Sequence, residues 1–186
     1  MHEISLGYTI EDYLNGTKVE ATTFEDIRQA IAKMLVERKG YPKENIKSKV
    51  EISFKIEDKQ YKNTVDLVAY SNEGQPVLLI HFGPGHVETY IRQVVSAARL
   101  LPDGAAKLAV VTDTKSALLI RVFDREILED SGYQAIPDWN RLLKIVEECP
   151  QYELTPEKRA VEERIFYAYS ELSCVCSQEE CYTRPT

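Results

Sequence analysis

Residues 77–82, "VLLIHF", place the strongest single constraint on the fold of this chain. The run is short, it is apolar except for His81, and the turn-forming segments "SNEGQP" and "GPG" bound it. Such a run predicts a strand with both faces covered, which is typical of the middle of a sheet that has helices on both sides. We therefore expect an α/β protein in which a Gly-Pro-Gly turn leads the chain away from this strand.

The spacing of apolar residues elsewhere predicts the other layers. Apolar and polar residues alternate from Val50 to Ile56, as they do in a strand with one exposed face. Thr22 and Glu25 fit a capping box at the start of a helix. The expected elements are strands at 50–56, 65–70, 77–82, 107–112 and 117–123, a turn at 58–63, and helices at 24–39, 87–101, 138–148 and 155–173.

In chain order, these elements are α-β-β-β-α-β-β followed by two helices, which predicts a mixed β-sheet flanked by helices. The 186 residues suffice for one domain with its own core. We expect residues 1–136 to form this core. Residues 137–186 are expected to form a C-terminal helical extension with a cysteine-rich tail, packed on the core rather than independent of it.

The charge is unevenly distributed along the chain. The formal net charge is −7, yet residues 1–123 hold 16 basic and 16 acidic residues, whereas residues 124–186 hold 7 basic and 14 acidic ones. The overall acidity argues against a nonspecific nucleic-acid binder, but it leaves open binding by the neutral first part. Six lysines there form either a solvated hairpin face or a phosphate track, with Lys47, Lys49 and Lys62 as the nucleic-acid contacts: Lys43, Lys47, Lys49, Lys55, Lys59 and Lys62.

Two observations on the sequence bear on location. No apolar run approaches the roughly 20 residues of a membrane span. The first residues, "MHEISLGYTIEDY", lack the basic and apolar regions of a signal peptide. We expect a cytoplasmic protein that has no contact with a membrane.

Asp66 is the most unusual residue of the predicted sheet. It interrupts an apolar strand, where a buried carboxylate without a partner costs several kcal/mol. One interpretation is an aspartate of an edge strand that accepts a hydrogen bond from a nearby backbone amide. The other is a metal ligand that projects from the strand, and the spacing alone does not decide between them.

Three segments together resemble a known family. They are "EDYLNGTKVEATTFEDIRQAIAKMLVERKGYPKENI", "NTVDLVAYSNEGQPVLLI" and "LAVVTDTKSALLI", and the similarity covers about residues 8–123. They resemble the N-terminal domain of type I restriction enzyme R subunits and its stand-alone relatives, within the PD-(D/E)XK nucleases. The resemblance implies a restriction-endonuclease-like mixed sheet of order αβββαβ that binds DNA and cleaves it.

The same resemblance implies a degenerate catalytic site. Members of the family end the third strand in Glu-x-Lys, where carboxylates hold Mg²⁺ and the lysine acts on the attacking water. Asp66 matches the first carboxylate, but His81-Phe82-Gly83 stands where Glu-x-Lys is expected. A Gln-x-x-x-Tyr motif on the next helix keeps Gln93 and has Ala97 in place of the tyrosine. Imidazole is a poor ligand for Mg²⁺, and glycine has no side chain that could act on water.

Two alternatives keep a metal at this site. The lost carboxylate could be replaced from elsewhere in the chain, by Glu25, Glu37 or Glu51, and the lost amine by Lys49 or Lys62. Alternatively, Asp66, His81 and His86 could bind a softer ion such as Mn²⁺ or Zn²⁺. The competing interpretation is that both histidines are structural.

The cysteines form a second candidate site. Cys174, Cys176 and Cys181 lie within eight residues, and Cys149 could be a fourth ligand. Four thiolates suit Zn²⁺ or an iron–sulfur cluster, and some members of the wider nuclease superfamily hold such a cluster with one upstream and three C-terminal cysteines. The alternatives are reduced thiols in a frayed tail, an adventitious disulfide, or a Cys174 that belongs to the core.

Three functions are compatible with these features. The favoured one is a nuclease-fold protein that has lost cleavage and binds nucleic acid or a partner protein, with the acidic final third favouring protein. The second is an active Mg²⁺-dependent DNA endonuclease with relocated catalytic residues. The third is a structural or assembly module in which the cysteine tail binds a metal or forms a homodimer contact.

Overall fold

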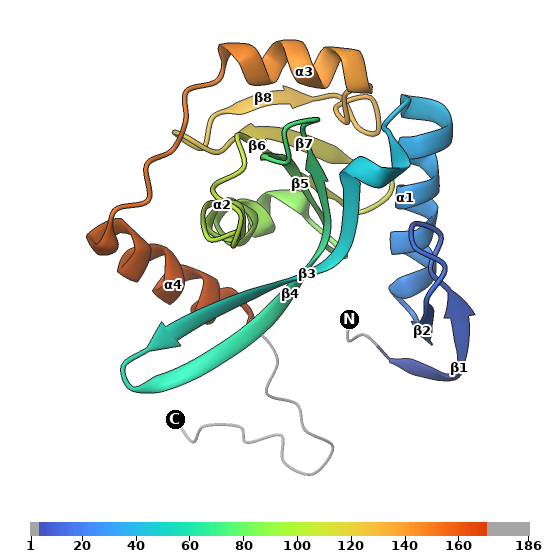
Figure 1. The fold of residues 1–186 in the computed structure, drawn as a ribbon, viewed down its shortest axis with the longest axis horizontal. Helices are drawn as coiled ribbons and strands as arrows, with labels where there is room; N and C mark the ends of the chain where they lie inside the picture. The colour runs from blue at the N-terminus through green and yellow to red at the C-terminus, as the bar shows by residue number, and fades with distance from the viewer. Residues whose placement is uncertain (1–3, 171–186) are drawn as a thin grey trace.

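The computed structural model describes residues 4–170, which fold around a six-stranded mixed sheet (Figure 1). The strand order is β3-β4-β5-β6-β7-β8, in which β5 and β6 run parallel and all other neighbours run antiparallel. The predicted central strand is confirmed, because β5 is the third of the six. The strands are β3 (Ile46–Ile56), β4 (Lys59–Tyr70), β5 (Pro76–Phe82), β6 (Leu108–Thr112), β7 (Ala117–Arg121) and β8 (Ile127–Asp130).

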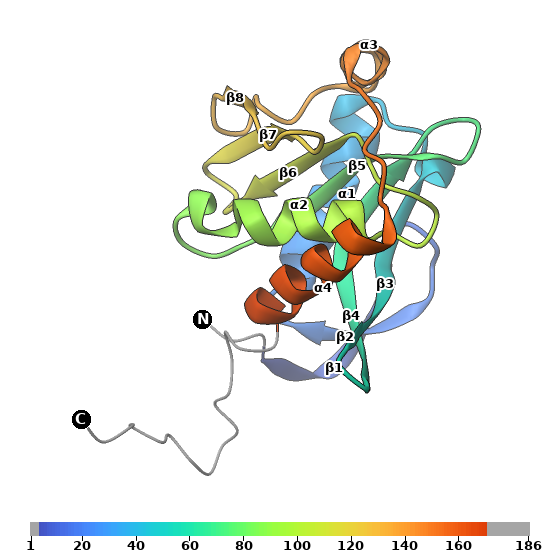
Figure 2. The same ribbon diagram turned by 90° about the vertical axis from the view of Figure 1, so that its left-hand side faces the viewer.

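Helices cover both faces of this sheet. Helices α1 and α3 lie on one face, and α2 and α4 lie on the other (Figures 1 and 2). The helices are α1 (Glu25–Lys39), α2 (Ile91–Arg99), α3 (Trp139–Glu148) and α4 (Pro156–Ser170), with short 3-10 turns at η1 (Lys43–Asn45) and η2 (Val87–Tyr90). The segment α1-β3-β4-β5-α2-β6 has the αβββαβ order of the restriction-endonuclease-like core.

The core consists of two apolar layers, one on each side of the sheet. Leu78 and Ile80 face α1 and α3, whereas Leu79 between them faces α2 and α4, and all three are buried. This alternation is the period of two that a strand imposes, and it explains why the segment contains almost no polar residue. Within residues 4–170, no helix has the length and apolar character that crossing a membrane requires.

Several sequence predictions need correction. A hairpin of β1 (Ser5–Glu11) and β2 (Lys18–Thr22) precedes α1 and was not predicted, although Leu6, Tyr8 and Ile10 alternate with other residues along β1. Nearly every position of β1 is exposed, so this alternation does not mark a buried face. The four-residue strand β8 was also missed, because its apolar and polar residues do not alternate. The turn expected at 58–63 is only two residues long, Glu57 and Asp58, and β4 already begins at Lys59.

The β3–β4 ribbon changes face in its middle. Ile46 packs on the α1 side, but Ile52 packs on the α2 side, although an even spacing should keep both on one face. Between them Lys49 has a positive φ of 50°, an uncommon conformation for a residue with a side chain. The partner strand makes the corresponding change between Val65 and Leu67. Asp66 therefore lies where the ribbon bends, and the far half of the hairpin projects beyond the sheet (Figure 1).

The C-terminal extension packs on the core through α4. The buried Glu162 carboxylate accepts hydrogen bonds from Ser96 (2.7 Å) and Arg99 (2.6 Å), which both belong to α2. Phe166 enters the apolar layer between α2 and β3, where its ring meets that of Phe54 at 5.3 Å. The boundary at residue 136 stays a prediction, since contact between two segments does not define a domain border.

Candidate functional site

The site at the end of β5 is formed around Asp66. The pairing of Leu67 with Ile80 places Asp66 of β4 opposite His81 of β5. The Nδ1 atom of His81 lies 2.8 Å from Oδ2 of Asp66, and the backbone N–H of Phe82 donates to the same oxygen at 3.0 Å. The backbone amide that one interpretation of Asp66 required is therefore present, but Asp66 lies on an interior strand rather than an edge strand.

Helix α1 contributes the positive charge of the site. Arg28 reaches Oδ1 of Asp66 through Nε and Nη2, both at 3.0 Å. Its Nη1 group also donates to Glu25, a carboxylate with no exposed surface. Lys49 of β3 approaches the same Glu25 oxygen at 2.8 Å. The buried Glu25 and the partly buried Asp66 therefore surround one guanidinium, which satisfies the demand that buried charges be paired.

The network extends from Glu25 towards the N-terminal hairpin. Gln29 donates from Nε2 to Glu25 at 2.7 Å and to Asp12 at 3.2 Å. Asp12 also accepts hydrogen bonds from the backbone N–H groups of Leu14 and Asn15 and from the Ser48 hydroxyl. Burial would raise the pKa of Asp12, but these hydrogen bonds outweigh it and lower the pKa.

The partners of Asp66 determine its protonation state. Burial alone would raise its pKa, but the hydrogen bond and charge of His81, the charge of Arg28 and the N–H of Phe82 lower the pKa to about 2. Asp66 is therefore an ionised carboxylate whose two oxygens both carry hydrogen bonds from the protein.

Gly83, the residue at the position of the family's lysine, is covered by an aromatic ring. A Cβ atom placed on Gly83 would lie 2.6 Å from the ring of Tyr90, closer than real Cβ contacts allow. The Tyr90 hydroxyl donates to the carbonyl of Pro84 at 2.9 Å, and its ring also contacts the His81 ring. The ring thus occupies the space into which a side chain at residue 83 would have to extend.

The residues of this site do not fit the Mg²⁺ that the family resemblance implies. Mg²⁺ is bound by carboxylate oxygens that have free lone pairs. Both oxygens of Asp66 are instead hydrogen-bonded, to Arg28, His81 and the backbone of Phe82. Within residues 4–170, no three His, Cys, Asp or Glu side chains cluster as metal ligands would. His86 lies exposed at the start of η2 and does not join Asp66 and His81 in such a group.

The structure places the other predicted carboxylates and Gln93 as follows. Gln93 and His81 line the same small cavity, whose volume of about 20 Å³ is close to that of a single water probe and which Phe166 of α4 helps to close. Glu37 and Glu51 lie on the surface, where Glu37 approaches Lys33 and Glu51 pairs with Lys62. Among the three candidate carboxylates, Glu25 alone reaches the network of Asp66, and of the two candidate amines Lys49 reaches it through Glu25.

The three lysines predicted to contact nucleic acid all have acidic partners. Lys49 pairs with Glu25 at 2.8 Å, Lys62 pairs with Glu51 at 2.9 Å, and Lys47 lies 3.5 Å from Asp103 and over the ring of Tyr70. Whether they contact phosphates is untested, but their charges are already balanced locally.

Of the four cysteines, the structure describes Cys149 alone. It follows α3 and is buried in the apolar layer, which raises the pKa of its thiol. Cys174, Cys176 and Cys181 lie outside the described residues, so the predicted Zn²⁺ or iron–sulfur site stays a prediction.

Sequence reasoning missed three residues of the site around Asp66: Arg28, which contacts Asp66, Gln29, which contacts Glu25, and Tyr90, which contacts His81. The signal for the first two was available, since Glu25, Arg28 and Gln29 share one helix face at spacings of three and four residues. No local pattern marks Tyr90, because its role depends on the absence of a side chain at Gly83.

Comparison with known proteins identifies a family. A family model described as the type I restriction enzyme R protein N terminus matches residues 23–138. No curated protein matches the chain. The matched segment runs from Thr23 to Asp138. It contains the whole αβββαβ core and all the residues that contact Asp66.

Proposed function

The chain belongs to the family of type I restriction enzyme R protein N-termini, and we propose that it is a member that no longer cleaves DNA and acts by binding a partner. The observation that carries the proposal is the pairing of Asp66 with Arg28. A PD-(D/E)XK nuclease needs its aspartate free for a divalent ion, whereas Asp66 is held in a salt bridge by a guanidinium.

The rest of the site supports loss of catalysis. His81, which stands at the place of the second metal-binding carboxylate, hydrogen-bonds to Asp66 instead of joining it in binding a metal. Gly83 has no amine that could act on water. Tyr90 fills the position that a catalytic lysine would use. The replacing groups are satisfied within the site: His81 hydrogen-bonds to Asp66, and the Tyr90 hydroxyl donates to the carbonyl of Pro84. The site is therefore built as a stable part of the core.

A protein is favoured over bare duplex DNA as the partner. The net charge is −7, and three lysines of the β3–β4 ribbon, Lys47, Lys49 and Lys62, lie within salt-bridge distance of carboxylates. A duplex binder needs unpaired cations to displace the counterions of the phosphates. Several large apolar side chains lie exposed instead, among them Leu6 and Tyr8 of β1 and Ile4 just before it.

A cleavage assay tests the loss of activity. Supercoiled plasmid and single-stranded DNA are incubated with Mg²⁺ and with Mn²⁺, comparing the wild type with Asp66→Asn. Asp58→Asn is the matched control, because it makes the same chemical change on an exposed hairpin turn. We expect no cutting by any of the three proteins. Cutting by the wild type and by Asp58→Asn but not by Asp66→Asn would establish the active-endonuclease alternative, and Glu25 would be mutated next.

A binding assay tests the choice of partner. Fluorescence anisotropy of a labelled duplex is measured between roughly 50 mM and 200 mM salt, a range in which phosphate contacts weaken steeply. We expect no saturable binding at the higher salt concentration. Tight binding that falls with salt, and that weakens in Lys47→Ala, would reverse the preference and identify DNA as the partner.

A further inference from the structure

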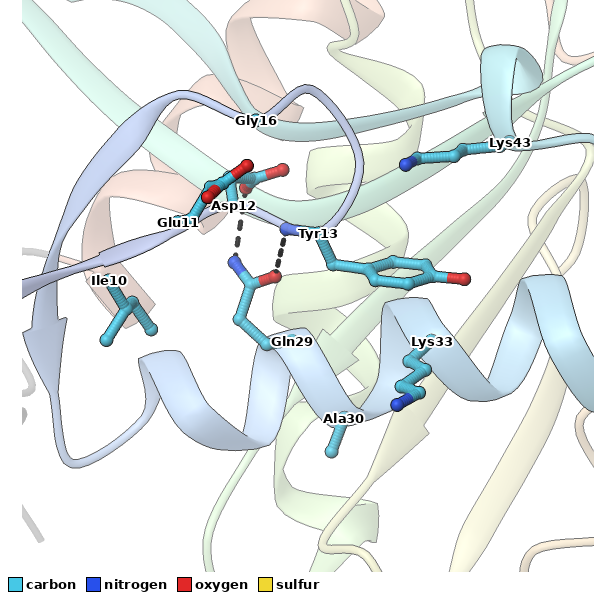
Figure 3. A pocket seen from close by; sticks show the side chains of 9 residues that line it. All are labelled: Ile10, Glu11, Asp12, Tyr13, Gly16, Gln29, Ala30, Lys33 and Lys43. Carbon is cyan, nitrogen blue, oxygen red and sulfur yellow. Dashed lines mark hydrogen bonds between the residues drawn. The ribbon is translucent and has the colours of Figure 1, made fainter.

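A pocket that borders the Asp66 network lies away from β5, between the β1–β2 loop and α1. It encloses about 460 Å³, a volume in the range of small-molecule sites, and it is more than twenty times larger than the cavity beside His81. Figure 3 shows Tyr13 at its centre, with Gln29 and Ala30 below and the side chains of Lys33 and Lys43 on either side of the ring. We call it the α1 pocket.

The wall of the α1 pocket is fixed before any ligand arrives. Gln29 accepts a hydrogen bond from the backbone N–H of Tyr13 at 2.7 Å and donates to Asp12 and Glu25 on its other side. Its amide is therefore held in one orientation by three partners, of which Figure 3 shows Tyr13 and Asp12. A pocket with such a wall loses little conformational freedom when it binds a ligand.

The apolar part of the α1 pocket suits a flat ring. The face of Tyr13, the side chain of Ile10 and the methyl group of Ala30 line the same space. Aromatic side chains bind planar groups by stacking, as they do with nucleobases.

Two ammonium groups stand beside this apolar part. The Lys43 Nζ atom lies 4.8 Å from the centre of the Tyr13 ring, and among the described residues it has no carboxylate within salt-bridge distance. Lys33 has only a long contact of 3.9 Å with Glu37, and both of these side chains are at least half exposed. Such contacts are weak, so both lysines can turn to an anionic group of a ligand.

The two carboxylates of the pocket differ in what they can do. Asp12 is buried and holds four hydrogen bonds from the protein, so it belongs to the wall. Glu11 is exposed, and one of its oxygens lies over Gly16, 3.4 Å from where a Cβ atom of that residue would be. A free carboxylate in this place can accept hydrogen bonds from ligand hydroxyl groups.

We propose that the α1 pocket binds a nucleoside monophosphate. The base lies against Tyr13 and Ala30, the side chains of Lys33 and Lys43 turn from either side of the Tyr13 ring towards the phosphate, and Glu11 accepts hydrogen bonds from the ribose hydroxyls. The ligand is either a free nucleotide or the phosphorylated end of a strand, since both present the same groups. This site is separate from the former catalytic position, and it does not depend on whether Asp66 supports cleavage.

Isothermal titration calorimetry of the full chain with AMP, GMP, CMP and UMP tests the proposal. We expect at least one monophosphate to bind saturably, and adenosine or inorganic phosphate alone to bind at least tenfold more weakly. Lys33→Ala and Lys43→Ala should each raise the Kd about tenfold, as loss of one charge-assisted contact does. Lys59→Ala is the matched control, because it removes an exposed lysine of the distant β3–β4 hairpin and should leave the Kd unchanged.

Each remaining outcome has a fixed meaning. The proposal is wrong if no monophosphate binds, if inorganic phosphate binds as tightly as the nucleotides, or if Lys59→Ala weakens binding as much as Lys43→Ala. Circular dichroism of each variant checks that it is folded, so that a loss of nucleotide binding is not mistaken for a loss of structure. A 5′-phosphorylated trinucleotide separates the two sources: equal or tighter binding identifies a strand end, and rejection identifies a free nucleotide.

Discussion

At the scale of single residues, the identity of Asp66 says less about function than its neighbours do. An aspartate at this position in the sequence predicts a metal ligand as readily as a structural residue. The structure gives it Arg28, His81 and the Phe82 amide, and no oxygen is left without a partner. A carboxylate in such a setting stabilises the fold and has little capacity for chemistry.

Arg28 holds this network together, so we expect Arg28→Met to be strongly destabilising. The variant leaves the buried Glu25 and the partly buried Asp66 without their shared cation, and breaking a buried ion pair typically costs about 3–5 kcal/mol of the free energy of unfolding. Urea denaturation of both proteins measures this loss. Arg141→Met is the control, because Arg141 and its partner Glu129 lie on the surface, and the expected loss is below about 1 kcal/mol. Equal losses in the two variants would contradict a buried network.

The lowered pKa of Asp66 makes a prediction about acid stability. Because the pKa is about 2 when folded and near 3.8 when unfolded, the unfolded chain binds the extra proton, and stability falls as the pH drops from about 4 to about 2. The shift corresponds to roughly 2 kcal/mol. The free energy of unfolding of the wild type and of Asp66→Asn is measured at pH 5 and at pH 2.5. The advantage of the wild type should shrink by about that amount at the lower pH, and a constant difference would show that Asp66 is not the titrating group.

The site residues could be predicted only where the sequence carries a local signal. Asp66 and His81 were found because a polar residue in an apolar strand is conspicuous, and Glu25 because it begins a helix. Tyr90 was not found, because its contact with Gly83 is set by how η2 folds back over the end of β5. Spacing along the chain contains no information about that approach.

At the scale of elements, the period of apolar residues predicted the sheet and the helices that cover it. β5, α2 and α3 were found because each buries one face or both. The hairpin of β1 and β2 buries little, and the alternation of Leu6, Tyr8 and Ile10 along β1 was a signal that went unused, whereas β8 has only four residues and no alternation. The bend of the β3–β4 ribbon at Lys49 was equally hidden, since a positive φ at a lysine leaves no mark in the sequence.

The contact between the end of β5 and η2 leads to a prediction about Gly83. In Gly83→Ala the new methyl group would meet the Tyr90 ring, which is rigid and whose hydroxyl is hydrogen-bonded to the Pro84 carbonyl. We therefore expect the free energy of unfolding to fall by about 1–3 kcal/mol. Removing the ring should relieve the clash, so the same change in a Tyr90→Ala background should cost less than about 1 kcal/mol. Thermal and urea unfolding of the four proteins complete this double-mutant cycle. If the losses of the two single variants simply add in the double variant, the Tyr90 ring does not contact residue 83, and the prediction is wrong.

At the scale of the whole molecule, two apolar layers on one sheet join the extension to the core. The α2 and α4 layer includes Phe166, and the α1 and α3 layer includes Trp139, the one tryptophan of the chain. The strands between the layers contribute side chains to both. A structure of this kind is expected to unfold in one cooperative step, because neither layer keeps its shape without the sheet.

This gives a test of whether residues 137–170 are independent of the core. Phe166 is 2% exposed and packs on Phe54, so Phe166→Ala should cost about 3–5 kcal/mol. The loss should appear equally in helix content by circular dichroism and in Trp139 fluorescence, although Trp139 lies on the opposite face. Val161→Ala lies on the same helix but is 53% exposed. It should change the free energy of unfolding obtained from either signal by no more than about 0.5 kcal/mol. A Trp139 transition that stays in place while helix content melts early would mean that α4 unfolds by itself, and the extension would then be a separate unit.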